Sequence, residues 1–132
     1  MSRLARMVVP GLPHHVTQRG NRREAIFFED GDQQIYCDML AEQLRKYSVE
    51  VWAYCLMPTH IHLIAVPHSA VACARTLGVG HMRYTQYRHR QSHAAGHLWQ
   101  GRFFSAPLDE IYCSRAIRYV EVLGTDTELA LE

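Results

Sequence analysis

The sequence predicts a single α+β domain over residues 1–132, built from an antiparallel sheet with two helices on one face and a further helix at the C-terminus. The first observation is the order of hydrophobic patterns along the chain, β-α-β-β-α-β-α, which folds as a split βαβ unit. The second is the pair of apolar strands at 49–57 and 60–67, separated only by the turn dipeptide "PT". The third is a length of 132 residues with 48% hydrophobic side chains, which is enough for one packed core.

The elements of the first half follow from their periodicity. The segment "HHVTQRG" at 14–20 alternates and contains Val and Thr, so it predicts a strand that ends at Gly20. Residues 30–49 carry acids at the start and apolar residues at helical spacing, namely Ile35, Met39, Leu40 and Leu44. A helix is therefore expected there, followed by the hairpin of 49–57 and 60–67.

The second half repeats the pattern. Residues 70–91 predict a helix, which Gly78 and Gly80 are expected to loosen. Residues 96–108 predict a loop and a strand. Residues 109–123 predict a helix opened by Asp109 and Glu110, which complement the positive end of the helix dipole.

Composition excludes several classes of protein. No apolar run approaches the roughly 18 residues of a membrane span, and the basic N-terminus lacks the apolar core of a signal peptide, so a cytoplasmic protein without membrane contact is expected. The four cysteines are spread singly along the chain. A disulfide framework or a zinc knuckle is therefore not expected.

Charge is segregated along the chain although the net charge is only +1. Residues 1–23 and 51–108 carry five arginines each and no Asp or Glu, while residues 24–50 and 109–132 are acidic. Two acid-free basic blocks favour a basic face, and the planar guanidinium of arginine suits phosphate. An arginine-rich composition with solvated charges is the alternative.

The motif "MPTHIHLIAV" at 57–66 places two histidines one residue apart within a predicted strand. Side chains alternate along a strand, so His60 and His62 share a face and lie roughly 6.5–7 Å apart along the chain, with Ile61 on the helix side. Two imidazoles converging on one ion predict a metal site, against the alternative of two core histidines. Histidine-triad nucleotide hydrolases need a third alternate histidine, and that position is Ile64.

The same stretch resembles the HUH motif (histidine, bulky apolar residue, histidine) of single-tyrosine DNA nucleases. "PGLPHHVTQRGNRREAIFF", "GHLWQGRFFSAPLDE" and "AIRYVE" resemble, in the same order, segments of the transposases of small bacterial insertion sequences and of the REP-associated tyrosine transposases. The resemblance implies a ferredoxin-like or RRM-like sheet, a divalent metal, Mg²⁺ or Mn²⁺, held by His60 and His62, and a tyrosine that cuts single-stranded DNA beside a hairpin. Imidazole suits Mn²⁺ better than Mg²⁺.

The family places its nucleophile in a "RYIE"-like segment of the last helix. The corresponding "RYVE" makes Tyr119 the expected catalytic residue, with Tyr112, seven residues earlier on about the same helix face, as the second choice. The family's third metal ligand, an Asn four residues after the tyrosine, is replaced by Leu123. Water, Glu121 or Asp126 could fill the place, or the enzyme could be impaired.

The expected partner is single-stranded or hairpin DNA, and the resemblance also implies a homodimer. Arginines for phosphates and aromatic rings for unpaired bases are the usual means of binding single strands. The expected DNA-binding residues are Arg19, Arg22, Arg23, Arg83, Arg88 and Arg102, interleaved with Tyr84, Tyr87 and Trp99. The predicted function is a metal-dependent transposase that nicks and rejoins DNA through a 5′-phosphotyrosine. The alternatives are an impaired or domesticated relative that binds hairpins without cutting them and, less favoured, a nucleotide hydrolase.

Overall fold

The computed structural model describes residues 8–92 and 96–125, with side chains described as far as residue 121. In chain order the elements are β1 (His14–Arg19), η1 (Asn21–Arg23), α1 (Asp32–Lys46), β2 (Glu50–Met57), β3 (His60–Val66), α2 (Ala72–Ser92), β4 (Phe104–Pro107) and α3 (Glu110–Thr125). This order confirms the predicted α+β fold, with an antiparallel sheet and a C-terminal helix.

The four strands form one antiparallel sheet in the order β2-β3-β1-β4. β1 lies between β3 and β4, so the first strand and the histidine-bearing strand are neighbours. Opposite each other in the β1–β3 register are Arg19 and His60, and also Thr17 and His62. Residues paired in this way project to the same side of a sheet, so β1 and β3 present these four side chains together.

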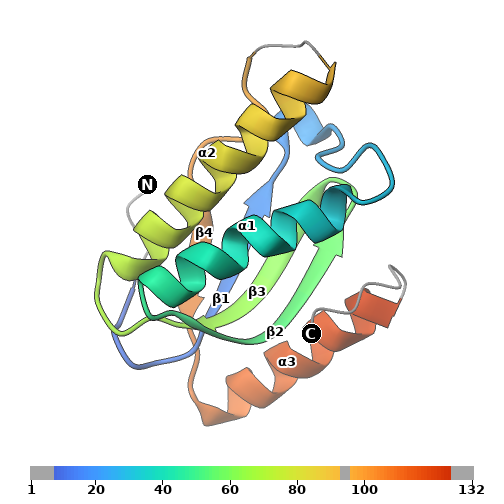
Figure 1. Cartoon of the computed structure of the whole chain (residues 1–132). Helices are drawn as coiled ribbons and strands as arrows, with labels where there is room; N and C mark the ends of the chain where they lie inside the picture. Colours follow the sequence, from blue (N-terminus) through green and yellow to red (C-terminus); the bar gives the residue numbers. More distant parts are fainter. Residues whose placement is uncertain (1–7, 93–95, 126–132) are drawn as a thin grey trace.

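Helices α1 and α2 cover one face of the sheet, where they lie side by side (Figure 1). The main core lies under them and includes Ile61, Leu63 and Ala65 of β3, all at most 2% exposed. These are the alternate residues predicted to face the helices, so the pleat of β3 places His60 and His62 on the other side.

Helix α3 packs on the opposite face, across β2 and β3 (Figure 1). A smaller buried cluster joins it to the sheet, made by Ala53, Cys55, Ile64, Cys113 and Val120. Ile64 is fully buried there. The position that would hold a third alternate histidine is therefore occupied by Ile64, which packs against α3.

The structure departs from the predicted elements in three places. The glycines do not loosen α2, which is continuous from Ala72 to Ser92. A Cβ added at Gly80 would lie 3.2 Å from Leu40 of α1, so this glycine permits a close approach of the two helices. The last strand is limited to Phe104–Pro107, and a short 3₁₀ turn, η1, follows β1.

The start of α1 is fixed by a buried carboxylate. Asp32 is fully buried and accepts hydrogen bonds from the backbone N–H groups of Phe28 and Glu29, at 2.8 and 2.9 Å. Burial alone would raise the pKa of this carboxyl, but the hydrogen bonds and a neighbouring arginine lower it. Asp32 is therefore an ionised anchor between the loop before α1 and the helix packed against it.

All four cysteines are buried, and no disulfide joins them. None of the described helices is both long and apolar enough to cross a membrane.

Candidate active site on the open face of the sheet

The two histidines of the HxH motif lie together on the face of the sheet that carries α3. The ring centroids of His60 and His62 are 4.8 Å apart, with the ring planes at 76°. The Nδ1 atom of His60 is 3.1 Å from the hydroxyl of Thr59, which leaves its Nε2 without a hydrogen bond among the described residues. His60 is half-buried, and His62 is only 7% exposed.

A third histidine joins this pair from β1. The Nε2 atom of His15 lies 3.0 Å from the Nδ1 atom of His62, and the two ring centroids are 5.2 Å apart. Sequence reasoning missed His15, although it belongs to the same alternating strand as Thr17 and Arg19. Its proximity to His62 depends on β1 pairing with β3, and this pairing is not visible in the local pattern.

The three imidazoles are held in their neutral form. Burial lowers the pKa of His62 to about 4, and the charges of His60, His15 and Arg19 add to this effect. Burial also lowers the pKa of His60, with a further contribution from Arg19, and burial lowers the pKa of His15. Neutral imidazole nitrogens have free lone pairs, so the rings can serve as metal ligands at neutral pH.

Tyr119 of α3 lies beside this cluster in the same chain. Its ring centroid is 6.1 Å from that of His62 and 6.5 Å from that of His15, edge-on in both cases. The side chain is 53% exposed, so the phenol is accessible to a large substrate. Tyr112, the second choice, is 59% exposed and has no ring contact with these histidines among the described residues.

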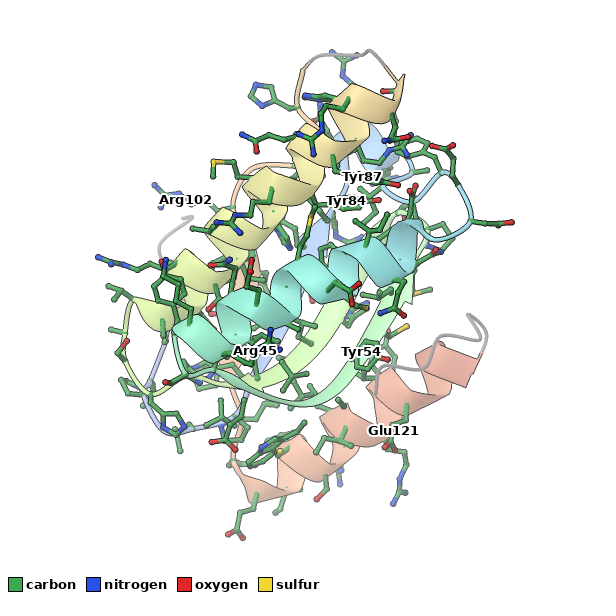
Figure 2. All side chains as sticks on the ribbon, in the orientation of Figure 1. Arg45, Tyr54, Tyr84, Tyr87, Arg102 and Glu121 are labelled. Atoms are coloured by element: carbon green, nitrogen blue, oxygen red, sulfur yellow. The ribbon has the colours of Figure 1, made fainter. Side chains whose placement is uncertain are left out.

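Of the candidates for the missing third ligand, Glu121 is described by the structure and does not reach the cluster. Glu121 is exposed on α3 and projects away from the strands (Figure 2). Leu123 belongs to α3, but its side chain lies beyond the described ones, and Asp126 lies outside the described residues. Within the part of the chain that the structure describes, no group of three or more His, Cys, Asp or Glu side chains has the geometry of a metal site. The described chain thus offers two converging imidazoles.

Two of the predicted DNA-binding arginines lie beside the histidines. Arg19 faces His60 across the β1–β3 ladder and is exposed. Arg102, labelled in Figure 2, is also exposed. It lines a small pocket together with Arg19. Arg22 and Arg23 follow immediately in η1, where both are exposed and adopt the left-handed backbone conformation, with φ of 56° and 61°.

The other two predicted arginines lie on α2, on the opposite side of the sheet. Arg83 is exposed and its guanidinium is 2.6 Å from the carboxylate of Glu42 in α1. Arg88 is only 6% exposed and pairs with Asp32 at 3.1 Å and with Glu29 at 2.8 Å. The Arg88 guanidinium is therefore already engaged by two carboxylates of its own chain, one of them fully buried.

The aromatic residues interleaved with those arginines are buried or half-buried. Tyr84 is fully buried and donates a hydrogen bond to the carbonyl of Ile26 at 2.6 Å, and Tyr87 donates to Asp32 at 2.8 Å. Both lie between α1 and α2 (Figure 2). Trp99 stacks on His81, with ring centroids 4.0 Å apart. These rings build the core and the loop before β4 rather than a stacking surface for bases.

Comparison with solved structures agrees with this architecture. A REP-associated tyrosine transposase bound to a REP hairpin superposes with a TM-score of 0.67 at 16% identity, covering 94% of this chain and 73% of the other. A crystal structure assigned as a transposase, from Deinococcus radiodurans R1, superposes with a TM-score of 0.59 at 21% identity, covering 87% of this chain and 92% of the other. At these identities the likeness establishes a shared fold.

Sequence comparison adds the family. No curated protein sequence matches this chain. The family model described as "Transposase IS200 like" matches residues 8–122, which include β1, the HxH strand and the helix with Tyr119. The chain therefore belongs to the IS200-like transposase family.

Proposed function

We propose that this chain is a metal-dependent DNA transposase that nicks and rejoins single-stranded DNA at hairpin-flanked ends through a 5′-phosphotyrosine on Tyr119. The observation that carries the proposal is the convergence of Tyr119, from the terminal helix, on the ring of His62 at 6.1 Å, with His60 at 4.8 Å from His62. A phenol beside two neutral imidazoles on an open sheet face suits phosphoryl transfer to a tyrosine.

The two imidazoles fit a divalent transition-type cation. His60 and His62 would hold it through their Nε2 atoms, since each Nδ1 already faces a partner, Thr59 or His15. The all-nitrogen donor set favours Mn²⁺ over Mg²⁺. What the cation supplies when bound is polarisation of a non-bridging phosphate oxygen and stabilisation of the charge that develops there. Among the described residues only His60 and His62 are proposed as donors, so the remaining positions would be filled by oxygens of DNA and water.

Tyr119 performs the covalent step. Its phenolic oxygen forms a bond to phosphorus while the bond from phosphorus to the 3′-oxygen breaks. The phenol proton leaves to solvent, and the departing 3′-oxygen takes up a proton. The phosphotyrosine retains an ester bond, so a later attack by a 3′-hydroxyl rejoins the strand without an external energy source.

His15 positions His62 for this role. If the Nε2 atom of His62 keeps its lone pair for a cation, its Nδ1 carries the proton and donates it to Nε2 of His15 at 3.0 Å. Hydrogen bonds of this kind fix the tautomer and the ring orientation of metal-binding histidines. His15 is thus a positioning residue whose contact orders His62 before DNA binds.

Hairpin DNA is the proposed partner because the REP-associated transposase of the same fold is bound to a REP hairpin. Arg19, Arg22, Arg23 and Arg102 are exposed on or next to the histidine face, and Arg83 would contact DNA only where a strand reaches α2. Affinity that rests on such phosphate contacts falls steeply with salt. A homodimer remains the expected assembly, but Tyr119 and the histidines of a single chain already meet.

The test is incubation of the protein with hairpin oligonucleotides that carry single-stranded flanks, in the presence of Mn²⁺. A denaturant-resistant protein–DNA adduct is expected for the wild type and for Tyr112→Phe, which is the matched control on the same helix. No adduct is expected for Tyr119→Phe or for His62→Ala. An adduct that survives Tyr119→Phe would contradict the assignment of the nucleophile.

A second candidate function is hairpin binding without cleavage. It is favoured by Leu123 in place of the third ligand that the family resemblance implies, and by the two-histidine donor set of the described residues. This candidate predicts salt-sensitive hairpin binding with no adduct at any Mn²⁺ concentration. Cleavage of any hairpin substrate by the 132-residue chain would eliminate it.

A further inference from the structure

A small pocket adjoins the histidine cluster on the side away from α3. Its volume is about 150 Å³, and its walls are Thr17, Arg19, Gln100, Arg102 and Phe104. The hydroxyl of Thr17 lies 3.4 Å from Nδ1 of His62, so one wall of the pocket contacts the histidine cluster. Thr17 and Phe104 are paired across β1 and β4, which places both side chains on the histidine face.

The outer wall of the pocket is fixed by backbone hydrogen bonds. The N–H of Gln100 donates to the carbonyl of Arg19 at 2.9 Å, and the side-chain amide of Gln18 donates to the carbonyl of Gln100 at 3.1 Å. These bonds extend the edge of β1 beyond the short strand β4. The segment that carries Gln100 and Arg102 is therefore held in place before any ligand binds.

The lining has the chemistry of a nucleotide site. Neither Arg19 nor Arg102 has an ion-pair partner among the residues that the structure describes, so both guanidinium groups are available for phosphate. Phe104 is 48% exposed, although it lies on a strand, and it offers a ring on which an unpaired base can stack. The pocket is smaller than the roughly 300–1,000 Å³ of typical small-molecule sites, which favours a single base.

The position of the pocket relative to Tyr119 decides which nucleotide it takes. Tyr119 approaches His62 from α3, near His15, whereas the pocket lies beyond His62 toward Arg19 and β4. In phosphoryl transfer the attacking and leaving oxygens lie roughly in line on opposite sides of phosphorus. If the tyrosine takes the 5′-phosphate, the leaving oxygen is the 3′-oxygen of the preceding nucleotide.

We propose that this pocket binds the nucleotide on the 5′ side of the cleaved bond, with its base on Phe104 and its phosphate between Arg19 and Arg102. This inference rests on the proposed function, because it takes Tyr119 as the nucleophile. It makes Gln100 the candidate determinant of base preference at that one position, whereas Phe104 would stack on any base and Arg102 would contact the phosphate. It also keeps the free 3′-hydroxyl beside the phosphotyrosine, ready for rejoining.

The first experiment locates the preference. Hairpins with randomised single-stranded flanks are cleaved by the wild type in Mn²⁺, and both products are sequenced to find the cleaved bond. An abasic nucleotide is then placed at each flanking position in turn. We expect the abasic nucleotide on the 5′ side of the bond to lower kcat/KM about five- to hundredfold, the range of one base–aromatic stack, and abasic nucleotides elsewhere to act less.

The second experiment assigns the effect to Phe104. Phe104→Ala should lower cleavage of the intact substrate by a similar factor and make it insensitive to the abasic nucleotide, whereas Phe28→Ala, an exposed phenylalanine on the α1 side, should leave the sensitivity unchanged. As a readout without cleavage, Tyr119→Phe is titrated with a hairpin that carries 2-aminopurine at the same position. Its fluorescence should be quenched on binding, and Phe104→Ala in this background should abolish the quenching.

The outcomes separate the two proposals. If no adduct forms with any hairpin, the proposed function fails, whatever the pocket binds. If the adduct forms but the abasic nucleotide on the 5′ side has no greater effect than its neighbours, or Phe104→Ala keeps the abasic sensitivity and the quenching, the pocket assignment is overturned while the proposed function stands.

Discussion

His15 and His62 join β1 to β3 across the candidate site, with Nε2 of the first 3.0 Å from Nδ1 of the second. The contact connects the strand that carries the HxH motif to the central strand of the sheet. In a hydrogen bond between two neutral imidazoles, one ring nitrogen carries the proton and the other accepts it. The tautomer and the orientation of His62 therefore depend on His15, a residue outside its own motif.

Removing the His15 ring should weaken metal binding. His15→Ala is expected to lower the Mn²⁺ affinity of the protein–hairpin complex about 10- to 100-fold, the usual effect of losing such a partner. His15→Gln, whose amide oxygen can accept the same hydrogen bond, should recover part of the loss. Electron paramagnetic resonance of free Mn²⁺ during titration measures the affinity directly, and equal affinities for wild type and His15→Ala would refute the positioning role.

The two glycines of α2 provide a matched pair for stability. Nothing lies within 4 Å of a Cβ added at Gly78, so Gly78→Ala should raise the free energy of unfolding by about 0.5–1 kcal/mol. Gly80→Ala brings a methyl group to 3.2 Å from Leu40 and should gain less or lose stability. Urea denaturation of the two variants measures the difference, and a Gly80→Ala variant at least as stable as Gly78→Ala would contradict the close contact of α1 and α2.

Arg88 and Arg83 should differ sharply in their contribution to folding. Arg88→Met leaves the carboxylate of Asp32 buried without its main countercharge and should cost about 3–5 kcal/mol of unfolding free energy. Arg83→Met removes an exposed pair with Glu42 and should cost less than about 1 kcal/mol. Denaturant midpoints of the two variants test this, and similar losses would show that the Arg88 pair is not the buried one.

Acid should destabilise the fold in part through His81. Burial lowers the pKa of this ring to about 3, and its Nε2 forms a hydrogen bond with the hydroxyl of Tyr36 at 2.7 Å. In the unfolded chain the same ring takes up a proton as the pH falls below the ordinary histidine pKa of about 6.5. The contribution to stability is therefore present above pH 6.5 and is lost as the pH falls from 6.5 toward 3.

For this ring alone the loss between pH 7.5 and 5.5 should be about 1.4 kcal/mol. His81→Gln can still accept the Tyr36 hydrogen bond but does not titrate, so its free energy of unfolding should fall less over that interval, by about this amount. Urea denaturation at the two pH values gives the difference between the proteins. An identical pH dependence in both would mean that His81 titrates normally in the folded state.

The fold was predictable because most elements have strong local signals. Alternation in 14–20, the two apolar runs of 49–57 and 60–67 around the turn dipeptide "PT", and helical spacing in 30–49 identify these strands and this helix without tertiary information. The boundaries were less certain where local propensity competes with packing. Gly80 lowers the helix propensity of α2, yet it is retained in a continuous helix because it allows contact with Leu40.

The candidate site was predictable only in part. His60 and His62 share a strand, so their common face follows from the pleat, whereas His15 joins them through a strand pairing that links residues 47 positions apart. The same limit applies to Arg88. Its sequence neighbours suggest an exposed basic helix face, but Asp32, 56 positions away, neutralises it inside the protein. Local sequence does not reveal such partners, because they depend on how distant elements pack.

Because the candidate site and the main core lie on different faces of the sheet, a copy of this protein could lose site residues without losing its fold. The main core lies under α1 and α2, while the candidate site occupies the reverse of the same strands, beside the smaller buried cluster under α3. A copy that loses its phenol or an imidazole would keep its core and remain a well-folded protein.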